Sequence, residues 1–160
     1  MNHEDHEDVE GHEVLPVTKR LSLRSPLPPE TERVVTATIG CAIAVHRALG
    51  PGFIESIYRK AMCIELESSR LAYERERAIT VAYRGVEISG QRVDLVVAGC
   101  VVVELKAVAR LDEIHSAQVI SYLKTTGLRA GLLLNFRSRL LRDGLKRFIL
   151  TIGPPPSGGS

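Results

Sequence analysis

The sequence predicts an α/β domain in which helices flank a mixed sheet that contains an antiparallel meander. Three observations support this fold class. Apolar residues recur at helical spacing over residues 30–49 and 55–70, three short strand-like segments follow, and a continuous apolar run comes after a further helix. Because strands and helices do not alternate along the chain, the order favours a layered α/β sandwich over a doubly wound sheet.

Two helices are expected in the first half of the domain. The first covers residues 30–49, where apolar residues return every three or four positions, and Gly50 followed by Pro51 ends it. The second covers residues 55–70 and has an apolar face of its own. The glycine-proline-glycine segment 50–52 therefore joins two helices.

Three strands are expected next, over residues 78–83, 92–97 and 101–105. Turn residues separate them: Arg84-Gly85 follows the first strand, and Ala98-Gly99-Cys100 follows the second. Short connections of this kind join antiparallel neighbours, so the three strands are predicted to form the meander.

The rest of the domain is predicted to contain one helix and one buried strand. Asp112 is a suitable N-cap for a helix that reaches Thr126 and is closed by Gly127. Residues 130–134 form a continuous apolar run, which is typical of a strand covered on both faces. Residues 140–150 fit either a basic helix or a final strand, and their periodicity does not decide between the two.

The composition indicates one domain with two extended ends. We expect a flexible acidic and proline-rich leader over residues 1–29, the domain over residues 30–152, and a flexible Gly/Pro/Ser tail over residues 153–160. The first fifteen residues contain six acids and no Lys or Arg, so the chain's net charge of +2 leaves +8 on the remainder. That charge permits binding to a polyanion without establishing it.

Composition also excludes several classes of protein. Cys41, Cys63 and Cys100 are widely spaced and lack a C-x-x-C pair, which indicates neither a disulfide framework nor a zinc site. No apolar run approaches the roughly 18 residues of a membrane span, and the acidic N-terminus does not resemble a secretory signal. We therefore expect a cytoplasmic protein that does not bind membranes.

Three polar residues follow the apolar strands at positions where they can meet. Side chains alternate across a strand, so Glu104 and Lys106 project from the same face at the end of Val-Val-Val-Glu-Leu-Lys. Asp94 lies on the preceding strand at nearly the same distance from the turn at 98–100, so a suitable hairpin register would bring its carboxylate toward Glu104. The spacing predicts two carboxylates and one amine in a common site.

This set of residues suits metal-dependent hydrolysis of a phosphodiester. Asp94 and Glu104 offer hard oxygen ligands for Mg²⁺ or Mn²⁺, and the Leu105 carbonyl is a third candidate ligand. The metal would polarise the phosphoryl group, while Lys106 would orient or deprotonate the attacking water and stabilise developing charge. The alternative is a solvated Glu-x-Lys ion pair at a strand edge, which would contribute only about 0–1 kcal/mol.

Gln118 and Tyr122 are four residues apart and share one face of the predicted helix. In a structural interpretation, Tyr122 packs on the sheet and Gln118 is a tolerated helix former. In a functional interpretation, both reach over the site to position Lys106 or a substrate phosphate. Spacing alone favours the structural interpretation.

Other residues have plain structural interpretations. His46 lies on an apolar helix face and is expected to be a hydrogen-bonded core or rim residue, and Tyr58 is expected to pack where two helices meet. With no Trp and three Phe in the chain, an aromatic platform for single strands is poorly supported. A basic group either follows a nucleic-acid backbone or forms a solvated face; it comprises Arg137, Arg139, Arg142, Lys146 and Arg147.

The segment Gly52-Phe-Ile-Glu55-Ser-Ile-Tyr58 resembles the signature of the GxxExxY protein family, a branch of the PD-(D/E)XK nuclease superfamily. The resemblance extends over roughly residues 35–150, with its parts in the right order. Further matching segments are Val-His46-Arg-Ala-Leu-Gly-Pro-Gly52, Val-Glu104-Leu-Lys-Ala-Val, Gln118-Val-Ile-Ser-Tyr122, Leu-Leu-Asn135-Phe and Arg142-Asp-Gly144.

The resemblance implies a restriction-endonuclease-like core and a Mg²⁺- or Mn²⁺-dependent nuclease. It implies that Asp94 is the superfamily's aspartate and that Glu104 and Lys106 form its E-x-K motif. Gln118 and Tyr122 would form a Q-x-x-x-Y motif that supports catalysis. All five residue types are intact in this chain.

Two further positions follow from the resemblance. Glu55 would complete the metal shell, although a carboxylate in the first turn of a helix is also favoured by the helix dipole alone. Val93 stands where the wider superfamily often has proline before its aspartate. The implied partner is nucleic acid, with DNA favoured over RNA, and a homodimer or a protein partner is possible. The alternative is a non-catalytic nucleic-acid- or protein-binding module on the same fold.

Overall fold

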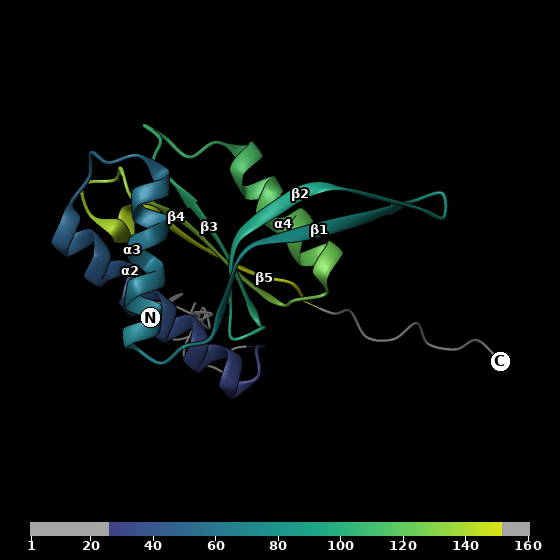
Figure 1. The fold of residues 1–160 in the computed structure, drawn as a ribbon, viewed down its shortest axis with the longest axis horizontal. Helices are drawn as coiled ribbons and strands as arrows, with labels where there is room; N and C mark the ends of the chain where they lie inside the picture. Colours follow the sequence, from purple (N-terminus) through teal and green to yellow (C-terminus); the bar gives the residue numbers. More distant parts are fainter. Residues whose placement is uncertain (1–25, 152–160) are drawn as a thin grey trace, which may run out of the picture.

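The computed structural model describes residues 26–151, so the predicted tail and all but residues 26–29 of the predicted leader lie outside the described part of the chain (Figure 1). The described part holds three helices, five strands and one short 3-10 helix. In chain order these are α2 (Pro29–Leu49), α3 (Glu55–Ser68), β1 (Tyr73–Tyr83), β2 (Val86–Val97), β3 (Val101–Lys106), α4 (Glu113–Thr126), β4 (Ala130–Asn135), η1 (Leu141–Gly144) and β5 (Leu145–Ile149).

Local sequence sets the ends of the helices. Pro29 begins α2. Proline has no N–H to donate, which costs nothing here because the first N–H groups of a helix have no partner within it. Gly50 ends the helix with a positive φ of 66°. At the start of α4, the Asp112 N–H donates to Nδ1 of His115 (3.0 Å), and Gly127 closes the helix in the left-handed conformation. The three predicted helices are confirmed, with small shifts at their ends.

The five strands form one mixed sheet in the order β1-β2-β3-β4-β5. Strands β1, β2 and β3 are antiparallel neighbours, β3 and β4 are parallel, and β5 returns antiparallel to β4. Helix α4 is the crossover that a parallel β3–β4 pair requires. The predicted α/β class and antiparallel meander are therefore confirmed.

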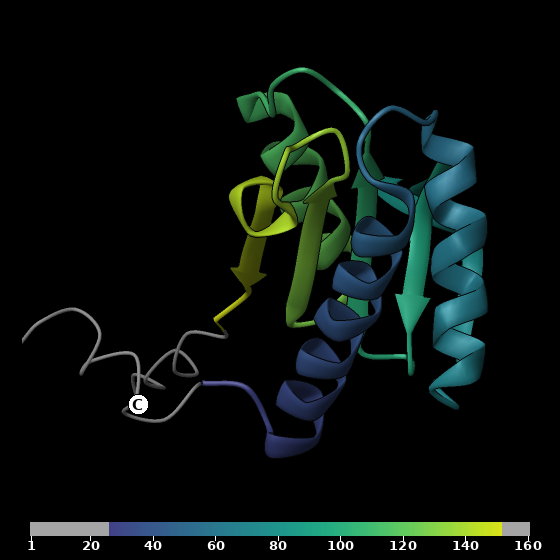
Figure 2. The same cartoon turned by 90° about the vertical axis from the view of Figure 1, so that its left-hand side faces the viewer.

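The sheet lies between two helical layers. Figure 2 shows α2 and α3 together on one face of the sheet, with α4 on the opposite face. Both faces of β3 and β4 are covered as a result, and every residue of β4 is buried. This double cover explains why the sequence of β4 is a continuous apolar run.

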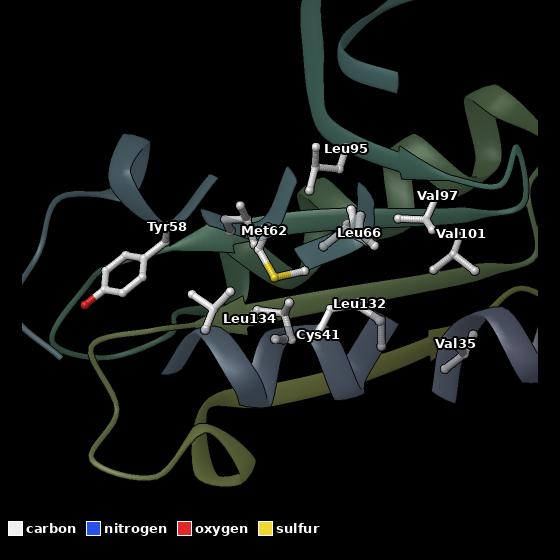
Figure 3. Close-up of a cluster of buried hydrophobic side chains, with 14 of the residues drawn as sticks. Val35, Cys41, Tyr58, Met62, Leu66, Leu95, Val97, Val101, Leu132 and Leu134 are labelled. Atoms are coloured by element: carbon white, nitrogen blue, oxygen red, sulfur yellow. The ribbon is translucent and has the colours of Figure 1, made fainter. Parts of the chain in front are cut away.

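Each helical layer packs on its own apolar cluster. In the cluster beneath α2 and α3, Cys41 and Met62 lie against Leu132 of β4 (Figure 3). In the cluster beneath α4, Val119 packs with Leu133, the next residue of the same strand. Successive side chains of β4 thus belong to opposite clusters, as strand alternation requires.

Strands β1 and β2 continue beyond the rest of the sheet as a two-stranded arm (Figure 1). Within β2, residues 86–92 are exposed and residues 93–97 are buried. The predicted strands 78–83 and 92–97 were placed correctly but were too short. The part missed in β2, residues 86–91, is exposed and buries no apolar face, and it is held as a strand by pairing with residues 79–83 of β1. The part missed in β1, residues 73–77, pairs with residues 93–97 of β2.

The segment that periodicity left open becomes η1 followed by β5. Residues 145–149 pair with β4 along its otherwise free edge, so the strand alternative is correct for this part of the chain. All three cysteines are free thiols, as expected. None of the helices between residues 26 and 151 combines the length and the apolar character needed to cross a bilayer.

Candidate active site

Asp94 and Glu104 lie side by side where β2 and β3 separate. The regular pairing of these strands ends at Leu95 and Val103. At the next position, the Asp94 N–H donates to Glu104 Oε1 (3.0 Å) and the Leu105 N–H donates to Asp94 Oδ2 (2.9 Å). Two side-chain carboxylates thus accept hydrogen bonds that backbone carbonyls would accept in a continuous sheet.

A twist in β2 explains why the strands separate at this point. Val93 packs in the cluster beneath α4, whereas Leu95 packs in the cluster beneath α2 and α3. Residues two apart on a regular strand share a face, so the backbone turns over at Asp94. Across from it on β1, Glu76 has a φ of 46° and is missing from the ladder. This irregularity increases the local twist and leaves room for the acids.

Lys106 ends β3 beside the two carboxylates. Its Nζ lies 3.9 Å from Glu104 Oε2, and its side chain is largely buried. The Lys106 carbonyl accepts the N–H of Phe136 (2.9 Å), which continues the parallel pairing with β4 and fixes the end of the strand. The ammonium group is therefore held near Glu104 by its backbone, and the predicted meeting of the three side chains is found.

Burial and like charge act together on Glu104. Burial, and after it the negative charge of Asp94, raise the pKa of Glu104 to about 8. The Asp94 N–H and the Lys106 ammonium oppose this rise only in part. A further positive charge between the carboxylates would favour the ionised form, because a nearby opposite charge stabilises a carboxylate. The pair is chemically suited to a cation.

Arg59, on α3, is the site residue that sequence reasoning missed. Its guanidinium contacts Asp94 Oδ1 through Nε (3.0 Å) and Nη2 (2.9 Å). It also lies 3.4 Å from a carboxylate oxygen of Glu55 and 3.8 Å from one of Glu76. The only signal in the sequence is the i, i+4 spacing of Glu55 and Arg59, which says nothing of Asp94.

Glu55 stands next to the carboxylate pair without joining it. Burial, and after it the negative charge of Asp94, raise its pKa above the usual range. No group of three or more His, Cys, Asp or Glu within residues 26–151 is arranged to hold a metal ion. Of the three candidate carboxylate ligands, Asp94 and Glu104 lie next to each other. The Glu55 carboxylate instead accepts a hydrogen bond from Arg59.

The backbone of Leu105 offers the third oxygen on the same side. Its side chain is fully buried in the core, and its N–H points toward β2, where it meets Asp94. In a strand, the N–H and C=O of one residue point to the same side, so the Leu105 carbonyl is also directed toward β2. Two carboxylates and one carbonyl form a set of hard oxygen donors that fits Mg²⁺ or Mn²⁺.

Tyr122 lies near this region on α4, and the charges of Glu104 and Asp94 act on its hydroxyl. The Tyr122 hydroxyl accepts a hydrogen bond from Gln91 Nε2 (2.9 Å), and burial, followed by the charge of Glu104, raises the Tyr122 pKa. Gln118 lies one turn earlier, and its Oε1 is buried without a hydrogen-bond partner in the described part of the chain. A buried acceptor without a donor indicates room for a water or a ligand group.

His46 and Tyr58 have the structural roles expected of them. His46 is buried, and its Nε2 lies 2.7 Å from the Ser138 carbonyl, so this nitrogen carries the proton and donates. Tyr58 is fully buried and stacks on Phe136, with 4.5 Å between ring centroids. Its hydroxyl donates to the Gly50 carbonyl (2.5 Å), which ties α3 to the end of α2.

Comparison with protein-family models matches residues 32–148 to the family described as the PD-(D/E)XK nuclease superfamily. The match spans both helical layers and the whole of the sheet from β1 to β4. No curated protein and no solved structure was found to match the chain.

Proposed function

Because the chain belongs to the PD-(D/E)XK nuclease superfamily, we propose that it hydrolyses phosphodiester bonds of nucleic acid with the help of a divalent cation. The interlocked pair of Asp94 and Glu104, with Lys106 3.9 Å from Glu104, is the observation that carries the proposal. Two buried acids beside an ammonium at a strand end are suited to handling a cation and an anion together.

The proposed ligands of Mg²⁺ or Mn²⁺ are Asp94, Glu104 and the carbonyl of Leu105, with Glu55 completing the shell. When bound, such an ion supplies Lewis-acid polarisation of the phosphate and a water of lowered pKa. The pKa of Glu104 supports this assignment. Burial and the like charge of Asp94 raise that pKa, so the ionised carboxylate is the form that a bound cation would stabilise.

The protein's own groups then divide the remaining work. Lys106 orients the attacking water and donates a hydrogen bond to a phosphoryl oxygen as negative charge develops on it. The oxygen of the water forms the new bond to phosphorus, and the bond from phosphorus to the leaving sugar oxygen breaks. Gln118 and Tyr122 position Lys106 or the phosphate from the α4 side, and the unpartnered Gln118 Oε1 supports this role.

The finer assignment follows from the Gly52 to Tyr58 signature, and we propose that the chain belongs to the GxxExxY branch. DNA is the preferred substrate over RNA in this proposal. We propose a cytoplasmic enzyme that acts alone, as a homodimer or with a protein partner.

The experiment is a cleavage assay on labelled DNA and RNA with Mg²⁺, with Mn²⁺ and with EDTA. We expect cleavage that EDTA abolishes and that Lys106→Ala lowers by at least about 100-fold, as for loss of a proton-transfer or charge-stabilising group. Lys124→Ala, an exposed lysine on α4, is the matched control and should cleave like the wild type. Equal cleavage by Lys106→Ala and Lys124→Ala would contradict the proposed catalytic role of Lys106.

A binding module without catalysis is the second candidate. One contact favours it: Arg59 already neutralises Asp94, so the acids have a protein cation as partner. This candidate predicts salt-sensitive nucleic-acid binding that survives Glu104→Gln, with no turnover under any metal condition.

A further inference from the structure

A cleft of about 390 Å³ opens beside the candidate active site. It lies between the segment that leads into α3 and the residues that follow β3 and β4, and it is lined by Gly52, Phe53, Ile54, Glu55, Ala107 and Arg137. Its volume falls at the small end of the roughly 300–1,000 Å³ typical of small-molecule sites. A single nucleotide fits such a space, and a duplex does not.

One wall of the cleft presents an aromatic ring on a fixed backbone. Phe53 is 48% exposed, although it is a large apolar residue. Its N–H donates to the Tyr58 hydroxyl (3.2 Å), and the same hydroxyl donates to the Gly50 carbonyl, so the loop is tied at two points. The Tyr58 ring also meets the Phe53 ring edge-on, with 6.2 Å between centroids. Tyr58 therefore supports the Phe53 ring from one side, and about half of the Phe53 surface is exposed among residues 26–151.

Another residue that lines the cleft presents a positive charge. Arg137 is exposed, and none of the carboxylates among residues 26–151 forms an ion pair with it. Its N–H donates to Asn135 Oδ1 (3.3 Å), and the Asn135 side chain also binds the backbone of Val108 at both N–H (3.1 Å) and C=O (2.8 Å). The ends of β3 and β4 are thus fastened together, and Arg137 is carried on a fixed backbone.

The cleft borders the proposed catalytic groups through Glu55. Ala107 follows Lys106 directly, and Glu55 lines the cleft while its side chain contacts Arg59, the partner of Asp94. Arg137 is the cationic residue among those that line the cleft, so an anionic group is drawn to it, and the apolar Phe53 is left for a base. The cleft is therefore the nearest described place for a nucleotide that follows a phosphate bound at Lys106 on the α3 side of the sheet.

We infer that the cleft binds one unpaired nucleotide of the substrate, with its base stacked on Phe53 and its phosphate at Arg137. The inference rests on the proposed function and names its substrate class: single strands, or duplexes with a frayed end or an extruded base. A base can stack on a protein ring only when one of its faces is free, whereas both faces of a base inside a duplex are covered by its neighbours. A single exposed ring is enough for such a subsite, even in a chain too poor in aromatic residues for an extended platform.

The test uses the absence of tryptophan from this chain. The Phe53→Trp variant carries one indole at the proposed stacking position, and Tyr83→Trp carries one on the exposed arm as a matched control. Titration with a short single-stranded oligonucleotide in EDTA should quench the fluorescence of Phe53→Trp and leave that of Tyr83→Trp nearly unchanged. Quenching by either the DNA or the RNA form of the oligonucleotide supports the subsite, and quenching by neither overturns it.

Affinities measured in EDTA give a second readout. Phe53→Ala should weaken single-strand binding about tenfold and duplex binding less than twofold, in line with the loss of one stacked base. Arg137→Ala should weaken single-strand binding and lower its salt dependence by about one released counterion, whereas Arg33→Ala, an exposed arginine on α2, should change neither. Equal losses for single strands and duplexes in Phe53→Ala would also overturn the inference.

These measurements need no cleavage, so they separate the two proposals. Selective quenching without any cleavage would support the proposed nucleotide subsite and contradict the proposed nuclease activity. Metal-dependent cleavage without selective quenching would support the nuclease activity and contradict the nucleotide subsite.

Discussion

Asp94 has protein partners on both of its carboxylate oxygens. The Leu105 N–H donates to Oδ2, and the Arg59 guanidinium occupies Oδ1. A buried carboxylate is tolerated only when such charge-assisted hydrogen bonds replace its hydration. Glu104 is less well supplied, since within residues 26–151 its Oε2 has the Lys106 ammonium, at 3.9 Å, as its single charged partner. Because Glu104 has so few partners to replace its hydration, burial raises its pKa.

Glu104 should make the stability of the metal-free protein depend on pH. Its pKa is about 8 in the folded protein and near the ordinary 4.5 in the unfolded chain, so the folded state holds the proton more tightly. The contribution to the free energy of unfolding is full below about pH 4.5 and is lost as the pH rises to about 8. We expect this loss to be on the order of a few kcal/mol.

Urea unfolding in EDTA at pH 5 and pH 8 measures the effect. The wild type should lose more stability than Glu104→Gln between these pH values, because glutamine does not titrate. Identical losses in the two proteins would show that Glu104 does not carry the pH dependence.

Arg59 should compete with a divalent cation for Asp94. Its guanidinium holds the Oδ1 oxygen, so a cation that uses this oxygen must displace an ion pair in which Arg59 is 22% exposed. A pair of this kind contributes roughly 1 kcal/mol, which corresponds to about a fivefold change in affinity. We therefore expect Arg59→Ala to bind Mn²⁺ about fivefold more tightly than the wild type in isothermal titration calorimetry.

Lys60→Ala is the matched control, because it removes a neighbouring, exposed positive charge from the same helix. Its Mn²⁺ affinity should stay within twofold of the wild type. Weaker Mn²⁺ binding by Arg59→Ala would mean that the arginine supports the acids as ligands instead of competing for them.

At the scale of elements, the contact between α4 and β4 depends on one glycine. A Cβ at Gly131 would lie 2.7 Å from Val119 Cγ1 and 3.3 Å from Leu123 Cδ1. The missing side chain thus lets α4 approach the sheet closely enough for Tyr122 to pack in one cluster with Val102 of β3 and Leu133 of β4. Gly40, in the middle of α2, has open space around the same position.

The two glycines should respond to alanine in opposite directions. Gly131→Ala overpacks the α4 layer and should lower the free energy of unfolding by about 1–3 kcal/mol. Gly40→Ala improves helix propensity at an exposed position and should raise it by roughly 0.5–1 kcal/mol. Thermal or urea unfolding of both variants checks this, and a destabilised Gly40→Ala protein would mean that α2 packs more tightly than its exposure indicates.

At the scale of the whole molecule, the site depends on where the meander meets the parallel pair. Strand β3 is antiparallel to β2 and parallel to β4, so the sheet changes from antiparallel to parallel pairing at this strand. The twist at Asp94 carries the arm of β1 and β2 away, whereas β3 stays between the helical layers until Lys106. The two acids thus lie, still buried, at a split in an otherwise continuous sheet, with α3 on one side and α4 on the other.

The sequence alone determined the elements whose residues carry their own signal. Apolar periodicity and the glycines at 50 and 127 define the helices, and the turn at 98–100 fixes the register that brings Asp94 and Glu104 together. Strand alternation places Lys106 beside Glu104 for the same reason. These features are local, because a short turn or a helical repeat leaves few conformations to choose from.

Only the tertiary structure decided the rest. The partnership of Arg59 with Asp94 spans 35 residues, and no spacing rule connects α3 to β2 over that distance. The outer part of β2, residues 86–92, buries no side chains, and β5 is a strand because β4 offers it a free edge. The same holds for the cleft between Phe53 and Arg137, which exists because the chain returns beside β3. Contacts of this kind depend on how distant segments pack, which local sequence does not specify.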